Sequence, residues 1–202
     1  MGTLQVGGTT LGVKNTVTNK VDLSNASIGS DTVFPAGGTG NPISVAVIVD
    51  EKANNTEGGN FTSGDWRTRD LNKVISDPDS IVTIESDTQT VSGHTSRYKF
   101  TLGAGTYLIS WSAPAFVVTG HQSKLYSVTD TSDLAIGSSE YSNSTNGTST
   151  ISTGHYVHTI SSSHTYEIRH RCSVNRNTNG FGLGLSFGAV NIFTQVLIQK
   201  LK

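Results

Sequence analysis

From Ile43 onward the sequence is a series of short runs rich in Val, Ile, Thr, Tyr and Phe, each bounded by Gly, Asn, Asp or Ser. Runs of this composition and length favour β-strands, and the residues between them favour turns. The runs are ISVAVIVD, SIVTIES, RYKFTLGAGTYLISWSAPAFVV, SKLYSVTD, DLAIGSSEYS, TSTISTGHYVHTIS, HTYEIRHRCS, FGLGLSF and IFTQVLIQKLK. We therefore expect residues 43–202 to form an all-β domain, a sandwich or jelly roll, with no long helix.

One stretch, DWRTRDLNKVISD, is compatible with a helical turn or with a strand that ends near Asn72. Pro78 disfavours helical geometry at Asp77, the residue before it. We favour the strand, followed by a turn at SDPDS, residues 76–80.

The stretch YEIRHRC alternates as a half-buried strand does. Tyr166, Ile168, His170 and Cys172 share one face, and Glu167, Arg169 and Arg171 share the other. A zinc site at His170 and Cys172 would need two further ligands, and no second Cys exists. We interpret the first face as packed inward or against another subunit, and the arginines as directed to water or to an acidic neighbour.

Residues 1–42 differ from the rest of the chain. They contain little apolar mass and no aromatic residue before Phe34, and Gly and Pro favour turns over regular elements. Such a segment cannot build its own core, so we expect an extended attachment arm that is loose or ordered on a partner. Its start lacks the cationic and apolar regions of a signal peptide.

Charge and the length of the apolar runs exclude two classes of partner. Charged residues make up 14% of the chain and the formal net charge is -1, so no basic field favours nucleic acid. No apolar run approaches the ~18 residues of a membrane span, so we expect no membrane insertion.

Three patterns resemble catalytic or metal sites. GLSFG matches a nucleophile elbow around Ser186, but neither an acid nor a histidine follows it in the sequence. His155 and His158 would lie on opposite faces of a strand. Asp77 and Asp79 are the calcium candidates, although two carboxylates supply only part of a calcium shell and a solvated turn is favoured. We expect no enzyme activity and no cofactor.

Several stretches resemble a domain that recurs near the C-termini of bacteriophage tail and fibre proteins. They are GGNFTSGDWRTRDLN, SDPDSIV, LGAGTYLISWSAPAF, HQSKLYSVTD, GSSEYS and YEIRHRCSVNRNTNGFG. Such domains resemble the C1q/TNF-like jelly roll, which is built as a trimer. The opening residues are similar to the attachment arms of phage fibre chains. The resemblance implies a structural protein of the virion without enzyme activity.

The function that we expect is a short trimeric tail fibre, assembled in the host cytoplasm and located on the virion. Its partners would be itself as a homotrimer, other virion proteins through residues 1–42, and a host cell-surface glycan or protein at the C-terminal domain. A capsid decoration or cement protein (head fibre) is the alternative, and a glycan-cleaving tail enzyme is a third possibility.

Candidate contact residues follow from residue type. Aromatic and amide side chains among polar residues suit ligand binding, and the candidates are Trp66, Tyr126, Asn177 and Asn179. Glycines allow close backbone approach, and the last strands have apolar residues on both faces. The candidate trimer contacts are Gly182, Gly184, Phe187 and Phe193. The loops SDPDS and SVNRNTNGFG are candidates for the exposed end of the domain.

Overall fold

The computed structural model of the protein describes residues 3–6, 9–14, 21–22, 43–87, 97–143 and 145–201. The chain divides into two units, residues 1–40 and 41–202. The first unit contains an antiparallel sheet of β1 (Thr3–Val6), β2 (Thr9–Lys14) and β3 (Val21–Asp22). The expectation that Gly and Pro favour turns over regular elements in this segment is therefore wrong for these strands. Two glycines separate β1 from β2 in the sequence, which is a hairpin signal.

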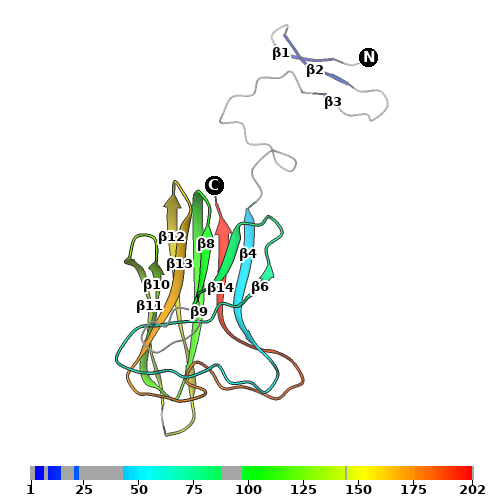
Figure 1. Cartoon of the computed structure of the whole chain (residues 1–202). Coiled ribbons are helices and arrows are strands. Elements are labelled where there is room, and N and C mark those ends of the chain that lie inside the picture. Colours follow the sequence, from blue (N-terminus) through cyan, green and yellow to red (C-terminus); the bar gives the residue numbers. More distant parts are fainter. Residues whose placement is uncertain are drawn as a thin grey trace. The chain divides into compact units, whose positions relative to one another are not determined.

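The second unit contains two antiparallel sheets (Figure 1). The strands are β4 (Ser44–Lys52), β5 (Arg67–Thr68), β6 (Lys73–Ser76), β7 (Val82–Asp87), β8 (Arg97–Leu102), β9 (Gly105–Phe116), β10 (Thr119–Ser127), β11 (Ser132–Ser142), β12 (Ser149–Ile160), β13 (His164–Cys172) and β14 (Asn191–Lys200). The first sheet has the order β11-β10-β13-β8-β7, with β5 also paired to β13. The second sheet has the order β12-β9-β14-β4-β6.

The strand pairs of the domain are nested in the sequence, so that strands near its two termini pair with each other and strands near its middle pair with each other. β4 pairs with β14, β8 with β13, β9 with β12 and β10 with β11. A double-stranded ribbon wrapped in this way produces the two Greek keys of a jelly roll. The all-β fold that the sequence predicts is confirmed, and no helix occurs in the ranges that the structure describes.

The core lies between the two sheets and follows strand alternation. On β9, Tyr107, Ile109, Trp111 and Ala113 are buried and the residues between them are partly exposed. Tyr166 and Ile168 of β13 meet them from the first sheet, as the alternation of YEIRHRC predicts. A smaller apolar cluster consists of Phe61, Ala115, Val118, Cys172 and Phe181.

The two ends of the domain carry different loops. The domain begins at Ile43, at the end where β14 finishes, and we call this the near end. At the opposite, far end, Gly59 pairs with Asn179 and Phe61 with Arg176, which joins the loop after β4 to the loop after β13. SDPDS follows β6, whose Ser76 pairs with Val47 close to the near end. The expectation that SDPDS and SVNRNTNGFG share one exposed end is therefore wrong.

The prediction of a strand at FGLGLSF is also wrong, because residues 181–187 form a loop. Phe181 is buried in the smaller cluster, and Gly182 has φ +149° where a Cβ would overlap the ring of Phe193. The Asn191 side chain accepts from the Leu185 amide (2.9 Å) and donates to the Leu185 carbonyl (3.1 Å), which fixes the loop. These local bonds replace a strand ladder.

The stretch DWRTRDLNKVISD contains no helix, which agrees with the strand that the sequence favours. It forms β5 and β6, which are separated because the four residues between them turn into the domain: Arg69 and Leu71 are both fully buried. A turn follows at residues 78–79.

Candidate functional site

The outer face of the second sheet carries no charged residue on its β12, β9 and β14 strands. Its outward residues are Leu108, Ser110, Ser112 and Pro114 on β9, Ile151, Thr153, His155, Val157 and Thr159 on β12, and Gln195, Leu197 and Gln199 on β14. None of them is Asp, Glu, Lys or Arg, and we call this surface the uncharged face. Ile151 and Val157 are more than half exposed, and Leu197 is 39% exposed.

A groove of about 360 Å³ adjoins the uncharged face at the far end. Ser112, Ile151 and Gln195 belong to both surfaces, and Leu183, Leu185 and Ile192 add an apolar wall. None of the groove's lining residues is charged. The uncharged face therefore extends continuously from the sheet into the groove.

Two of the four candidate trimer contacts, Gly182 and Phe193, line this groove. Gly182 packs against Phe193, which is itself buried, and a Cβ at Gly184 would crowd the backbone of Thr56. These three residues thus have packing roles within one chain. Phe187 is 83% exposed, so it is the candidate that a second copy could reach.

The outer face of the first sheet is charged and brings two candidate binding residues together. Lys124 places its Nζ 4.0 Å from the ring centroid of Trp66 and 5.8 Å from that of Tyr126. Arg169 lies over Tyr126 at 3.4 Å and donates to Glu167 (2.8 Å). One face of each aromatic ring is therefore covered by a cation.

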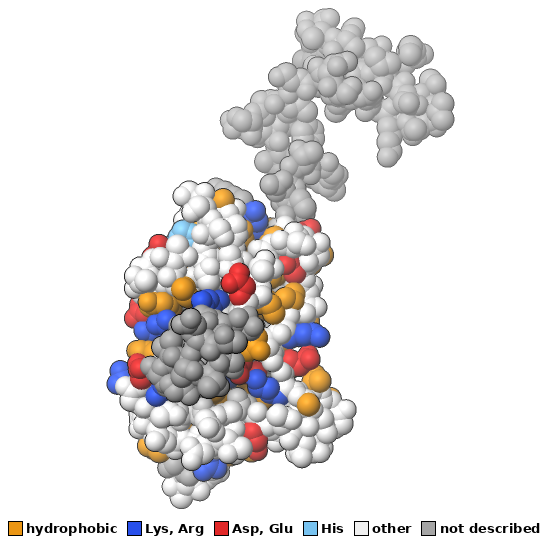
Figure 2. Space-filling model, viewed as in Figure 1, with side chains coloured by type: hydrophobic (Ala, Val, Ile, Leu, Met, Phe, Trp, Pro, Cys, Tyr) orange, Lys and Arg blue, Asp and Glu red, His pale blue; other side chains and the backbone are white. Residues whose placement is uncertain are grey.

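The other two candidates lie elsewhere. Asn177 and Asn179 are in the far-end loop after β13, where the Asn179 side chain accepts from Arg176 Nε (2.9 Å). Acidic and basic side chains are interspersed on the face of the molecule shown in Figure 2, and neither sign forms a continuous field there.

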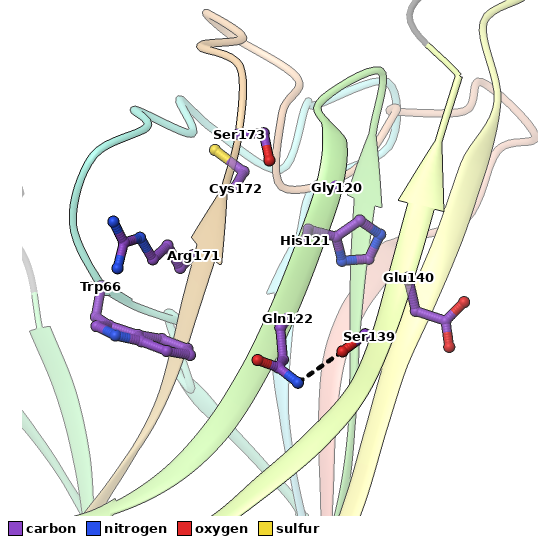
Figure 3. A pocket seen from close by; sticks show the side chains of 9 residues that line it. All are labelled: Trp66, Gly120, His121, Gln122, Ser139, Glu140, Arg171, Cys172 and Ser173. Atoms are coloured by element: carbon purple, nitrogen blue, oxygen red, sulfur yellow. Dashed lines mark hydrogen bonds between the residues drawn. The ribbon is translucent and has the colours of Figure 1, made fainter.

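A hollow of about 340 Å³ opens on the first sheet beside Trp66 (Figure 3). We call it the Trp66 pocket. It is lined by Trp66, Gly120, His121, Gln122, Ser139, Glu140, Arg171, Cys172 and Ser173. β10 provides three of these residues, β11 two and β13 two, since Gln122 pairs with Ser139 on one side and with Arg171 on the other. The strand register therefore assembles the pocket from segments distant in sequence.

Two lining residues that could do chemistry are held in inert forms. His121 bonds through Nδ1 to His170 Nε2 (2.9 Å) and through Nε2 to Thr150 Oγ1 (2.7 Å). Burial lowers the pKa of His121 to about 4, so the ring is neutral near pH 7. Burial raises the pKa of the Cys172 thiol to about 12, so it is neither a thiolate nucleophile nor a ready metal ligand.

The His121–His170 contact was not anticipated from the sequence, where 49 residues separate the two rings. It arises because β10 and β13 are neighbours with His121 opposite Cys172. Within the described ranges, no group of three His, Cys, Asp or Glu side chains is placed to hold a metal. His155 and His158 lie on opposite faces of β12, as expected, and His158 Nδ1 meets the Tyr166 hydroxyl (3.0 Å).

The calcium candidates lie in the turn after β6. The Asp77 carboxylate accepts from the amides of Ile81 (2.8 Å) and Val82 (3.0 Å), and Asp79 is exposed. Asp77 therefore caps the turn with both of its oxygens. Ser186 is exposed in the loop before β14, outside the strand–turn–helix setting of an elbow. No helix that could span a membrane occurs in the part of the chain that the structure describes.

A buried charge network supports the far end of the domain. Arg69 is fully buried and donates to Thr194 Oγ1 (2.6 Å), the Pro114 carbonyl (3.2 Å) and the Phe181 carbonyl (2.8 Å). Its Nη2 lies 3.9 Å from the buried carboxylate of Asp50. Arg69, from the stretch DWRTRDLN, thus joins β9, β14 and the far-end loop.

Comparison with known proteins gives similarity to solved structures only. No family model matches the sequence, and no curated protein shows significant similarity. The chain is similar to the globular domain of zebrafish complement 1qA protein, at 12% identity over 80% of this chain and 98% of that chain, with a TM-score of 0.46. It is similar to the PRD1 vertex protein P5, at 13% identity over 79% of this chain and 97% of that chain, with a TM-score of 0.41.

These two solved structures are a C1q globular domain and a vertex protein. Both matches are weak. The assignment of the fold therefore rests on the strand pairing of this chain, and neither match indicates what the protein does.

Proposed function

We propose that this protein is a structural component of a bacteriophage virion, a short homotrimeric fibre. It attaches to the particle through residues 1–42 and presents its jelly-roll domain to the host surface. The observation that carries the proposal is the uncharged face on β12, β9 and β14. The sequence resemblance to phage tail and fibre domains supports the setting.

The uncharged face suits a subunit interface. The central parts of protein interfaces are depleted in charged residues, and exposed apolar patches mark interaction sites. The opposite sheet carries Arg169 and Arg171 on its outer face, and Arg171 is exposed to solvent. Three copies that pack these uncharged faces about an axis would leave the charged sheets outside.

The arm suits attachment for a different reason. Residues 1–40 form a unit of their own and contain short strands but little apolar mass. Backbone groups of such a segment need a partner to be held firmly. We propose that other virion proteins provide it.

A decoration or cement protein on the capsid is the second candidate, because the same trimer would serve there. A glycan-cleaving enzyme is less favoured at the Trp66 pocket, since Glu140 is the only carboxylate among the residues that line it. Glycoside hydrolysis ordinarily uses two carboxylates that flank the bond.

The experiment is to delete residues 1–42 in the phage that encodes the protein and to purify the particles. We expect a folded trimer that is missing from the particles, together with reduced adsorption to host cells. Particles that still contain the truncated chain would contradict attachment through the arm. Antibody labelling of intact particles at the capsid, with normal adsorption of the deletion phage, would favour the decoration protein.

A further inference from the structure

We propose that the Trp66 pocket binds a sugar residue that carries a carboxylate. The inference rests on the proposed function in one respect, that a host surface is the source of the sugar. It concerns the outer face of the first sheet, so the proposed trimer leaves all three pockets open.

The polar atoms of the pocket divide into those already bonded and those still available. Gln122 Nε2 donates to the Gly137 carbonyl (3.1 Å) and to Ser139 Oγ (2.8 Å), which leaves its carbonyl oxygen as an acceptor. Both nitrogens of His121 are engaged. None of the ion pairs between described side chains includes the Arg171 guanidinium or the Glu140 carboxylate.

The available groups match a sugar. Hydroxyl groups both donate and accept, so they can donate to Gln122 Oε1 and to Glu140 and accept from the Ser173 hydroxyl. Pockets for small ligands typically combine an apolar surface with a few such convergent polar groups.

Trp66 provides the apolar surface. Lys124 covers one face of the indole at 4.0 Å and is not among the residues that line the pocket, so we assign the other face to the ligand. In Figure 3 the indole is seen edge-on with Arg171 above it and Gln122 beside it. The cation behind the ring holds it in place, which reduces the ordering cost when a sugar ring stacks on it.

Arg171 determines the charge of the ligand. It is exposed at the pocket rim, and Figure 3 shows it on the opposite side of the pocket from Glu140. An available guanidinium matches a carboxylate in a planar, two-bonded pair. Because Glu140 lies across the pocket, the ligand needs its carboxylate on the Arg171 side and hydroxyls toward Glu140. A sugar acid has this arrangement, and a simple anion does not.

The test uses the full-length protein with three probes: methyl β-D-glucuronide, methyl β-D-glucoside and acetate. The glucoside is the same ring without the carboxylate, and acetate is the carboxylate without the ring. The chain has two tryptophans, and Trp111 is buried, so a change in tryptophan fluorescence reports on Trp66. Calorimetry gives the affinities.

We expect the glucuronide to bind at least ~10-fold more tightly than either control, the factor that one charge-assisted contact of about 1.4 kcal/mol provides. Arg171→Gln should reduce glucuronide binding to the glucoside level, and Trp66→Ala should weaken both sugars. Lys73→Gln removes an exposed cation from β6 of the other sheet and should change nothing.

Equal binding of glucuronide and glucoside, tight acetate binding, or unchanged glucuronide affinity in Arg171→Gln would each overturn the proposal. The oligomeric mass of every variant is measured alongside. A trimer that binds no glucuronide removes the pocket assignment and leaves the proposed function in place. Glucuronide binding by a protein that is absent from particles removes the proposed function and leaves the pocket.

Discussion

Arg69 is the residue on which most of the far end depends. Burial lowers its pKa to about 10, which the nearby Asp50 and Asp70 oppose, so it stays charged at neutral pH. Burial also raises the pKa of Asp50, and Arg69 and Lys52 counter that shift. Removal of the guanidinium therefore leaves three oxygen acceptors without their donor. It also takes away one of the two cations beside the buried carboxylate of Asp50, where only Lys52 remains at 3.1 Å.

We predict that Arg69→Met lowers the free energy of unfolding by about 3–5 kcal/mol, the range for breaking a buried ion pair. Urea denaturation at fixed protein concentration measures it. The control is Arg171→Met, where the arginine is exposed, which should change stability by less than about 0.5 kcal/mol. A loss below about 1 kcal/mol in Arg69→Met would mean that the network contributes little.

The buried pair of His121 and His170 should make the fold less stable at acid pH. Burial lowers the pKa of both rings, and the pKa of His121 falls to about 4. For His121, Glu140 opposes this shift and Arg69 adds to it. For His170, Arg69 and His121 both add to the shift. A folded pKa below the unfolded value of about 6.5 means that protonation favours the unfolded chain. The contribution of the neutral rings to the free energy of unfolding is therefore complete above about pH 6.5 and is lost as the pH falls toward about 4.

The measurement is the free energy of unfolding against pH for the wild type and for His121→Gln. Each histidine can contribute a slope of up to about 1.4 kcal/mol per pH unit in this window. We expect a shallower decline in the variant because one titrating ring is gone. Parallel curves across the same pH window would show that His121 is not responsible.

At the scale of elements, the pairing of β12 with β9 requires a glycine at position 154, which lies opposite Trp111. A Cβ at Gly154 would overlap the ring of Trp111, whose Nε1 donates to Ser123 Oγ (2.8 Å) in the other sheet. The substitution Gly154→Ala should therefore displace the ring and weaken the bond between the sheets.

We predict a cost of about 1–3 kcal/mol for Gly154→Ala, typical of overpacking. Gly103→Ala is the matched control, because nothing lies within 4 Å of the place that its new methyl group would take, and its φ is ordinary. Thermal unfolding of both variants provides the comparison. Equal midpoints would show that the sheets adapt without strain.

The sequence predicts strands where alternation is regular and fails where local bonds decide. On β13, Tyr166, Ile168 and His170 are buried on the face that the alternation of YEIRHRC predicts, although Glu167 on the other face is buried as well. The loop FGLGLSF has strand composition, but glycine geometry and the Asn191 bonds hold it outside any ladder.

The candidate site was predictable only in part. Trp66 and Tyr126 were selected by residue type, and their meeting around Lys124 depends on the pairing of β5 and β10 with β13. Strand register across such distances is set by the assembled core, so Arg171 and Glu140 could not be placed beside Trp66 from spacing alone.

At the scale of the whole molecule, the uncharged face should hold the subunits together. We predict that Leu197→Glu, on the β14 strand of this face, dissociates the trimer into folded monomers, because an unpaired carboxylate would be buried in the interface. Ile136→Glu is the matched control: Ile136 is 52% exposed on β11 of the other sheet. Sedimentation velocity should show monomers for the first variant and trimers for the second.

The most direct test of the proposed trimer is the mass of the wild-type protein in solution. Native mass spectrometry at micromolar concentration should give three times the chain mass of 21.3 kDa. A single species of 21.3 kDa under the same conditions would contradict the trimer, and with it the assignment of the uncharged face as a subunit interface.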